Sequence, residues 1–384
     1  MQGKVRVLIV DDAVVVRRML ADILDSDAEL EVVGTAANGK AALEKMPQVE
    51  PMVVILDIDM PEMNGIETLI EIRKRDVSIP VIMFSTSTER GASTTLEALS
   101  RGATDYVTKP STMRGARSAV DAIRQELVPK IKALGKRRLR SAGLGGGAGR
   151  ARPNVPIPAN VRRPVRPSTG GTVSAPRPGN TKTSLRAKGA TSKYRLLAIG
   201  TSTGGPNALA ELFPKLPANF PIPIVIVQHM PPIFTRILAE RLTAASHIKV
   251  QEGKQGEILR PGMGYIAPGD YHMTVHRSHG SELALKLNQN PHEHSCRPAV
   301  DVLFRSIAGE CADKTLAVVL TGMGRDGAAG AKLIKGKGGG ILAQDEGSSV
   351  VWGMPGLIAK QGLAEKVLDL NQMAEEITRR VCIT

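Results

Sequence analysis

Polar side chains of a particular kind follow the apolar runs in the first third of the chain. Asp11 and Asp12 follow the first run, Asp57 the third, Ser85 the fourth and Lys109 the fifth. Carboxylates that meet at one edge of a sheet repel one another unless a hard divalent cation, most naturally Mg²⁺, lies among them. A lysine and a small hydroxyl group are what an incoming phosphoryl group needs, because one neutralises its charge and the other donates a hydrogen bond. These residue types predict a site for Mg²⁺ and a phosphoryl group.

A serine between glycines stands near the start of the second half of the chain. Ser202 follows the apolar run 196–199 and lies within Gly-Thr-Ser-Thr-Gly at 200–204, which matches G-x-S-x-G. Such glycines permit a sharp strand-to-helix turn that exposes the serine, and amides at the helix start can stabilise an oxyanion. The turn is equally compatible with phosphate binding, although it lacks the spacing and the lysine of a P-loop. A nucleophilic serine needs a base and a carboxylate as partners.

One histidine and one aspartate have the positions that such partners need. His229 directly follows the apolar run 224–227, and Asp326 lies in a glycine-rich loop after the run 316–320. Because parallel strands end at one edge of their sheet, we expect these two residues and Ser202 to converge there as a catalytic triad. Their order along the chain differs from the Ser, Asp, His order of α/β-hydrolases, so this triad would be a separate solution.

Backbone amides beside the serine and the aspartate are candidate oxyanion donors. Thr203 follows the serine and Met323 lies between two glycines, so we expect the nearby amides to receive the developing charge. Glu293 between two histidines is only a weak metal signal, and no cofactor is expected in this half of the chain. The other histidines are less suitably placed, which favours a surface or structural role: His247, His272, His276, His279, His292 and His294.

Short β-branched runs alternate with helical patterns from residue 1 to about residue 135. Five strands, each followed by a helix, predict a doubly wound parallel sheet of the flavodoxin-like (βα)5 type. Residues 194–384 again begin with strand, turn and helix, which predicts a Rossmann-like α/β domain with a largely parallel sheet. The strands predicted in the first domain are 5–10, 30–34, 53–56, 81–84 and 104–107.

The net charge of +14 is concentrated between the two predicted domains. Residues 136–193 hold 14 of the 51 Lys and Arg and none of the Asp and Glu, which leaves 37 basic against 37 acidic residues elsewhere. The segment is rich in Pro and Gly and has no aromatic residue. This composition predicts a disordered linker rather than a dedicated nucleic-acid arm, and no specific nucleic-acid partner is expected.

Composition also bounds the class of protein. A chain of 384 residues with 42% hydrophobic and 23% charged residues fits a globular protein of two or three domains. No apolar run approaches the roughly 20 residues of a membrane helix, and the acidic residues at 11 and 12 do not fit a signal peptide. A cytoplasmic protein that is not membrane-inserted is therefore expected. Cys296, Cys311 and Cys382 lack any short spacing and predict free thiols.

Residues 1–135 resemble bacterial two-component receiver domains over their whole length. The resemblance implies that Asp57 accepts a phosphoryl group from a histidine kinase. It also implies that Asp12, Asp57 and the backbone carbonyl of Asp59 bind Mg²⁺, with Asp11 assisting. Ser85 and Lys109 would read the phosphate, and Tyr106 would be the aromatic switch. The matching residues are Asp11-Asp12, Leu56-Asp57-Ile58-Asp59-Met60-Pro61, Ser85 and Lys109-Pro110.

With the exception of the linker, the whole chain resembles the CheB family of chemotaxis response regulators, which are protein-glutamate methylesterases and glutamine deamidases. The resemblance implies hydrolysis of γ-glutamyl methyl esters, and deamidation of glutamines, on the cytoplasmic helices of chemoreceptors through an acyl-serine. Phosphorylation at Asp57 would uncover or release the catalytic cleft. The matching motifs are Gly200 to Gly205, Gln228-His229-Met230, Pro268-Gly269-Asp270, Arg297-Pro298, Asp301 to Phe304, Gly322 to Gly327 and Gly353-Met354-Pro355.

Two other functions fit part of the sequence. A DNA-binding response regulator would explain the basic charge, but that charge lies in the linker and no helix-turn-helix pattern follows residue 193. A non-catalytic phospho-switch, or a related enzyme in another signalling pathway, would keep the receiver. Ester hydrolysis by the fragment from residue 194 onward separates the enzyme from the phospho-switch.

Overall fold

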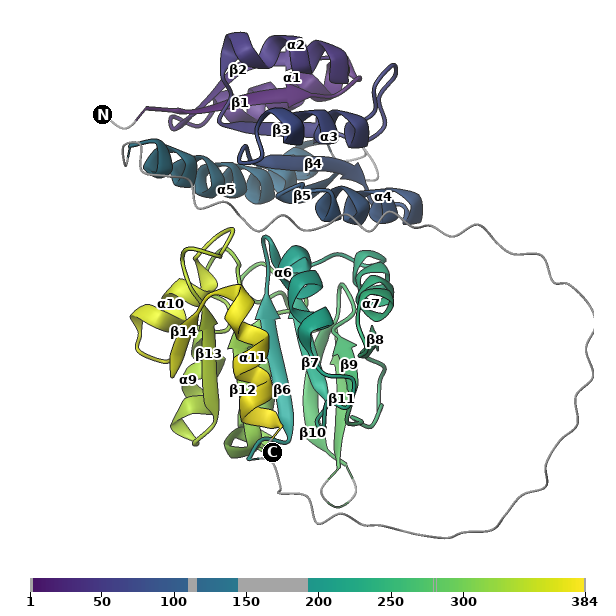
Figure 1. Ribbon diagram of the computed structural model, residues 1–384. Helices are drawn as coiled ribbons and strands as arrows, with labels where there is room; N and C mark the ends of the chain where they lie inside the picture. The colour runs from purple at the N-terminus through teal and green to yellow at the C-terminus, as the bar shows by residue number, and fades with distance from the viewer. Residues whose placement is uncertain (1–2, 110–115, 144–192, 279, 281, 383–384) are drawn as a thin grey trace, which may run out of the picture.

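The computed structural model describes residues 3–109, 116–143, 193–278, 280 and 282–382, which form two α/β units (Figure 1). The first unit has a five-stranded parallel sheet in the order β2-β1-β3-β4-β5. Its elements are β1 (Val5–Val10), α1 (Val14–Asp25), β2 (Leu30–Ala36), α2 (Gly39–Val49), β3 (Val53–Asp57), α3 (Gly65–Arg75), β4 (Val81–Thr86), α4 (Glu89–Ser100), β5 (Asp105–Lys109) and α5 (Ala116–Gly143).

Helices cover both faces of this sheet, as the continuous apolar runs of its strands predict. Val7 and Ile9 of β1 belong to the apolar cluster with α1 and α5, whereas Leu8 and Val10 belong to the cluster with α2, α3 and α4. The predicted flavodoxin-like fold is confirmed, and each predicted strand overlaps an observed one.

The second unit is a sheet of seven parallel strands in the order β14-β13-β12-β6-β7-β9-β8, with a separate antiparallel hairpin of β10 and β11. The predicted Rossmann-like, largely parallel sheet is thereby confirmed. Its elements are β6 (Leu196–Thr201), α6 (Gly205–Leu212), η1 (Phe213–Lys215), β7 (Ile224–Gln228), α7 (Phe234–Ala245), β8 (Lys249–Glu252), β9 (Met263–Ile266), β10 (His272–Arg277), β11 (Leu283–Asn288), α8 (Val300–Glu310), η2 (Ala312–Lys314), β12 (Thr315–Val319), α9 (Ala328–Gly336), β13 (Gly340–Gln344), α10 (Met354–Lys360), β14 (Lys366–Leu368) and α11 (Leu370–Val381).

The central strands of this sheet are buried along their whole length. β6, β7, β12 and β13 have no exposed residue, because α6, α7 and α11 cover one face while α8, α9 and α10 cover the other. β6 lies between β12 and β7, and all three run in the same direction. The loops that follow these three strands are therefore neighbours at one edge of the sheet.

The boundary predicted at residue 135 is wrong, because helix α5 continues to Gly143. Arg138 forms an ion pair with Asp76, at 2.6 Å between Nη2 and Oδ2, so part of the basic segment is bound to the first unit. The remainder of the predicted linker, 144–192, lies outside the described residues.

The two units contact each other through α4, β5 and α5 of the first and α6 and α7 of the second (Figure 1). The rings of Tyr106 and Phe234 stack with centroids 4.8 Å apart. Around them, Arg236 Nη2 lies 2.7 Å from Glu89 Oε1, and Asn207 Nδ2 donates to the Ala103 carbonyl at 3.2 Å. An apolar contact with a polar rim thus joins the units.

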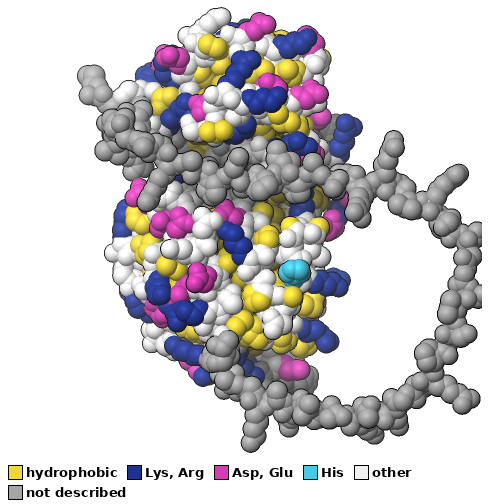
Figure 2. Space-filling view, viewed as in Figure 1, with side chains coloured by type: hydrophobic (Ala, Val, Ile, Leu, Met, Phe, Trp, Pro, Cys, Tyr) yellow, Lys and Arg dark blue, Asp and Glu magenta, His cyan; other side chains and the backbone are white. Residues whose placement is uncertain are grey.

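Charged side chains of both signs are interspersed over both units in the view of Figure 2, as the balanced charge outside the linker predicts. Within the described ranges, no helix is both long and apolar enough to span a membrane.

Candidate functional site

Three residues predicted at the strand ends of the first unit lie together. Lys109 Nζ is 2.9 Å from Asp11 Oδ2 and 2.8 Å from Asp57 Oδ1. Both carboxyl groups are buried, with Asp11 1% and Asp57 4% exposed. The lysine at the end of β5 therefore bridges carboxylates that follow β1 and end β3, as the strand-end positions predict.

The donor set at this edge fits Mg²⁺. Carboxylate oxygens of Asp11, Asp12 and Asp57 lie within 4.8 Å of one another, and such oxygens are the ligands that Mg²⁺ prefers. Burial raises the pKa of Asp57 to about 6; the Lys109 ammonium opposes this shift and the Asp11 carboxylate adds to it. A divalent cation beside these carboxyl groups would favour their charged forms.

Ser85, Tyr106 and Asp59 are not drawn into this cluster. The Ser85 hydroxyl donates to the Gly91 carbonyl at 3.2 Å, and the Tyr106 ring faces the second unit. Asp59 is exposed. The roles of these three residues in reading phosphate, switching and binding Mg²⁺ stay predictions.

The second site begins at the turn that ends β6. The amide of Ser202 donates to the Thr321 carbonyl at 3.0 Å, and the amide of His229 donates to the Thr201 carbonyl at 3.2 Å. These bonds connect the loops after β12, β6 and β7. An ideal Cβ on Gly322 would lie 3.0 Å from the Ser202 Cβ, so a glycine is required for this close approach.

His229 and Asp326 form a buried pair, with 2.8 Å between Nε2 and Oδ2. The carboxylate also accepts backbone N–H groups of Val300 at 2.6 Å, Asp301 at 2.8 Å and Gly327 at 2.8 Å. The first two amides open helix α8, so Asp326 caps that helix and its charge lies at the positive end of the helix dipole. Burial raises the pKa of Asp326, but the hydrogen bonds from His229 and these amides lower it overall.

The imidazole of His229 responds to the same partners. Burial alone lowers the pKa of His229, but the Asp326 carboxylate and the neighbouring Cys296 thiol raise it overall. Stabilisation of the imidazolium is what a base needs when it takes a proton from a serine. Cys296, Cys311 and Cys382 are free cysteines, as predicted, but the position of Cys296 beside the base was not foreseen.

Gln228 joins the nucleophile and the base through its side chain, and sequence reasoning assigned it no role. Its Nε2 donates to the Ser202 carbonyl at 3.0 Å and to the His229 carbonyl at 3.2 Å. The side chain is buried, and an ideal Cβ on Gly205 would lie 2.0 Å from its Oε1. The only signal in the sequence is a glutamine at the end of an otherwise apolar strand.

The candidate oxyanion donors have free amides. Within the described residues, neither the Thr203 nor the Met323 N–H group donates a hydrogen bond, and the Ser202 hydroxyl has no partner. A hydroxyl and two unused amides therefore accompany the His229–Asp326 pair. Such an arrangement can perform acyl transfer, with a serine nucleophile, a histidine base and donors for an oxyanion.

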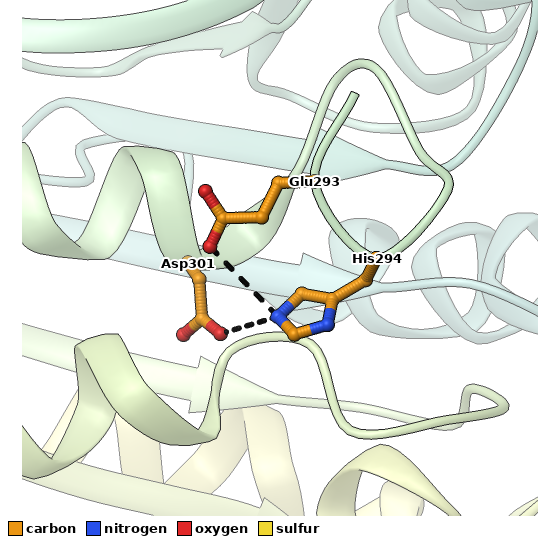
Figure 3. A group of neighbouring side chains, drawn as sticks. All are labelled: Glu293, His294 and Asp301. Atoms are coloured by element: carbon orange, nitrogen blue, oxygen red, sulfur yellow. Dashed lines mark hydrogen bonds and ion pairs between the residues drawn. The ribbon is translucent and has the colours of Figure 1, made fainter. Parts of the chain in front are cut away.

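A second group of titratable residues lies on the other side of Asp326 (Figure 3). His294 Nε2 is 3.0 Å from Asp301 Oδ2 and 3.8 Å from Glu293 Oε1. The carboxylate of Asp301 also accepts the amide of Gly330 at 2.7 Å, and Arg305 binds both oxygens of Glu293. Because these ligand atoms already have partners and a guanidinium lies among them, the group does not fit a metal ion.

Comparison with known proteins gives the family of both units. A family model described as CheB methylesterase matches residues 197–377, and one described as a response regulator receiver domain matches residues 7–121. A protein-glutamate methylesterase/protein-glutamine glutaminase of Trichodesmium erythraeum is 46% identical over 98% of this chain and 99% of the relative. One of the same description from a Nocardioides species is 47% identical over 98% of this chain and 95% of the relative.

Among solved structures, the CheB methylesterase catalytic domain of Thermotoga maritima is 43% identical, with a TM-score of 0.47. It covers 48% of this chain and 97% of its own.

Replacing the carboxylate that holds His229 should change the titration of the imidazole. Asp326→Asn removes the negative charge that stabilises the imidazolium and leaves the opposing effect of burial, so we expect the pKa of His229 to fall by at least about one unit. NMR titration of the imidazole measures this shift. Asp313→Asn, which removes an exposed carboxyl group at the amino end of β12, is the matched control and should leave the His229 titration unchanged. An unchanged titration in Asp326→Asn would contradict the assigned pairing.

Proposed function

The chain belongs to the CheB methylesterase family, and we propose that it demethylates γ-glutamyl methyl esters and deamidates glutamines on chemoreceptor proteins. The observation that carries this proposal is the meeting of the Ser202 hydroxyl, the His229–Asp326 pair and two unused amides at one sheet edge. Relatives of this description, nearly half identical over the whole chain, support the choice of substrate.

Acylation begins with the serine. His229 takes the hydroxyl proton as Ser202 attacks the ester carbonyl, and the Asp326 carboxylate stabilises the resulting imidazolium. The amides of Thr203 and Met323 donate to the oxyanion of the tetrahedral intermediate. When the intermediate collapses, the imidazolium gives its proton to the departing methoxide, and methanol leaves.

Deacylation repeats these steps with water as the nucleophile. His229 takes a proton from water, the hydroxide attacks the acyl-serine, and the proton returns to Ser202 as the glutamate carboxylate is released. A glutamine side chain follows the same route, with ammonia in place of methanol as the leaving group. One site therefore accounts for both activities.

The receiver unit takes a phosphoryl group on Asp57 from a histidine kinase. Asp11, Asp12 and Asp57 would hold Mg²⁺, which when bound supplies positive charge that offsets the carboxylates and the phosphoryl oxygens. Lys109, which already contacts two of these carboxyl groups, is placed to respond to the new charge. We place this activity in the cytoplasm, where the kinase and the receptor segments lie.

Control of the esterase passes through the contact between the units. Arg137 of α5 donates to the backbone carbonyls of Ser349 and Val350, and the next carbonyl, that of Val351, accepts the Gly322 amide at 3.0 Å. Gly322 precedes Met323, one of the two oxyanion donors. The receiver therefore contacts a segment bonded to the catalytic loop, and phosphorylation releases or uncovers the site by shifting this contact.

Removal of the nucleophile should abolish turnover. Ser202→Ala deletes one hydroxyl group and little volume, so we expect the fold to persist and methanol release from methylated receptor membranes to fall by about 10⁴-fold or more. Ser246→Ala, a serine beyond the far end of helix α7, is the matched control and should keep its activity. A Ser202→Ala rate within tenfold of wild type would show that another group attacks the ester.

A charge swap across the contact should separate regulation from catalysis. Glu89→Arg places two guanidinium groups side by side, so we expect methanol release without phosphodonor to rise about two- to fivefold, the range of one exposed ion pair. The double variant with Arg236→Glu restores the attraction and should return the unstimulated rate to that of wild type. The rate with acetyl phosphate and Mg²⁺ should be the same in all three proteins. If Glu89→Arg leaves the unstimulated rate unchanged, this contact does not restrain the enzyme.

A further inference from the structure

A hollow of about 590 Å³ adjoins the loop that carries Asp326. Its lining includes Arg325, the residue directly before Asp326, and Lys332 of α9, with His294 and Asp301 on one wall. Ser202 and His229 do not line it. The hollow is therefore separate from the triad but shares a loop with it, and the proposed function gives it no role.

The anionic groups at this wall are already satisfied. Asp301, only 1% exposed, accepts the Gly330 amide and pairs with His294 (Figure 3). Glu293 beside them is bound by both terminal nitrogens of Arg305. These carboxylates hold the local structure together and are not free to neutralise a further cation.

The cations of the hollow are in the opposite condition. Arg325 and Lys332 are exposed, and neither side chain has an ion pair or a hydrogen bond with any residue that the structure describes. Two positive charges therefore face the same hollow without a counter-charge. A negatively charged group that reached both would be attracted without displacing an existing partner.

The remaining lining is apolar and limits the shape of what enters. Ala328, Leu357 and Leu363 contribute the hydrocarbon surface, and the volume suits a few side chains rather than a whole helix. A short hydrocarbon stem that ends in a carboxylate matches both features. This is the chemistry of a glutamate side chain.

We propose that this hollow binds an acidic side chain of the substrate protein, close in sequence to the glutamyl ester at Ser202. The inference rests on the proposed function and adds a determinant of specificity to it. An ester flanked by glutamates would be hydrolysed more efficiently than one flanked by neutral residues. Because each turnover converts an ester into a glutamate, one hydrolysis would also favour the next nearby.

Two peptides test this preference with the full-length chain. Both carry one γ-methyl glutamate, and the acidic positions within four residues of it are Glu in one peptide and Gln in the other. We expect kcat/KM for the Glu peptide to exceed that for the Gln peptide about fivefold at low salt, mainly through KM, and the difference to shrink at high salt.

Variants assign the preference to the hollow. Arg325→Gln combined with Lys332→Gln should reduce the ratio of the two kcat/KM values to about one. Lys249→Gln removes an exposed charge from β8, the strand at the far edge of the sheet, and as the matched control should keep the wild-type ratio. Arg325→Glu should reverse the preference when Lys replaces Glu in the first peptide.

The outcomes separate this inference from the proposed function. Equal kcat/KM for both peptides in the wild type, or an unchanged ratio in the double variant, would overturn the acidic-side-chain site and leave the esterase intact. Hydrolysis of neither peptide by the wild type would overturn the proposed function, and this inference with it.

Discussion

A carboxylate that is buried and yet charged is the constraint on which the second site depends. Asp326 is 2% exposed, and its charge persists because the first two amides of α8, the Gly327 amide and His229 all donate to it. Asp301, from the first turn of α8, accepts in turn an amide of α9. The two helices thus cap each other, and the base is held by the same bonds that fix their packing.

The parallel sheets explain how distant segments reach one place. β12, β6 and β7 are neighbours that end at the same edge, so residues more than a hundred positions apart lie in adjacent loops. The same geometry in the first unit brings Lys109 to Asp11 and Asp57. Between the units, Arg137 contacts a segment bonded to the catalytic loop, which makes a change in one sheet felt at the other.

Strand-end residues could be predicted from the sequence because periodicity locates strands and parallel topology determines where they end. This reasoning identified the pairs Lys109–Asp57 and His229–Asp326, which the structure brings into contact. It missed the amides that hold Asp326, since a backbone N–H capped from 25 residues away leaves no mark in composition. It also placed Arg138 in the linker, because a basic run looks the same whether it is solvated or, as here, paired with Asp76.

The central claim is that His229, held by Asp326, activates the Ser202 hydroxyl and not the Cys296 thiol beside it. Treatment with a fluorophosphonate, followed by proteolysis and mass spectrometry, tests this directly, because the reagent labels an activated nucleophile stoichiometrically. The account predicts one label per chain, on Ser202, and no label in His229→Ala. A label on Cys296, or labelling of Ser202 that persists without His229, would contradict it.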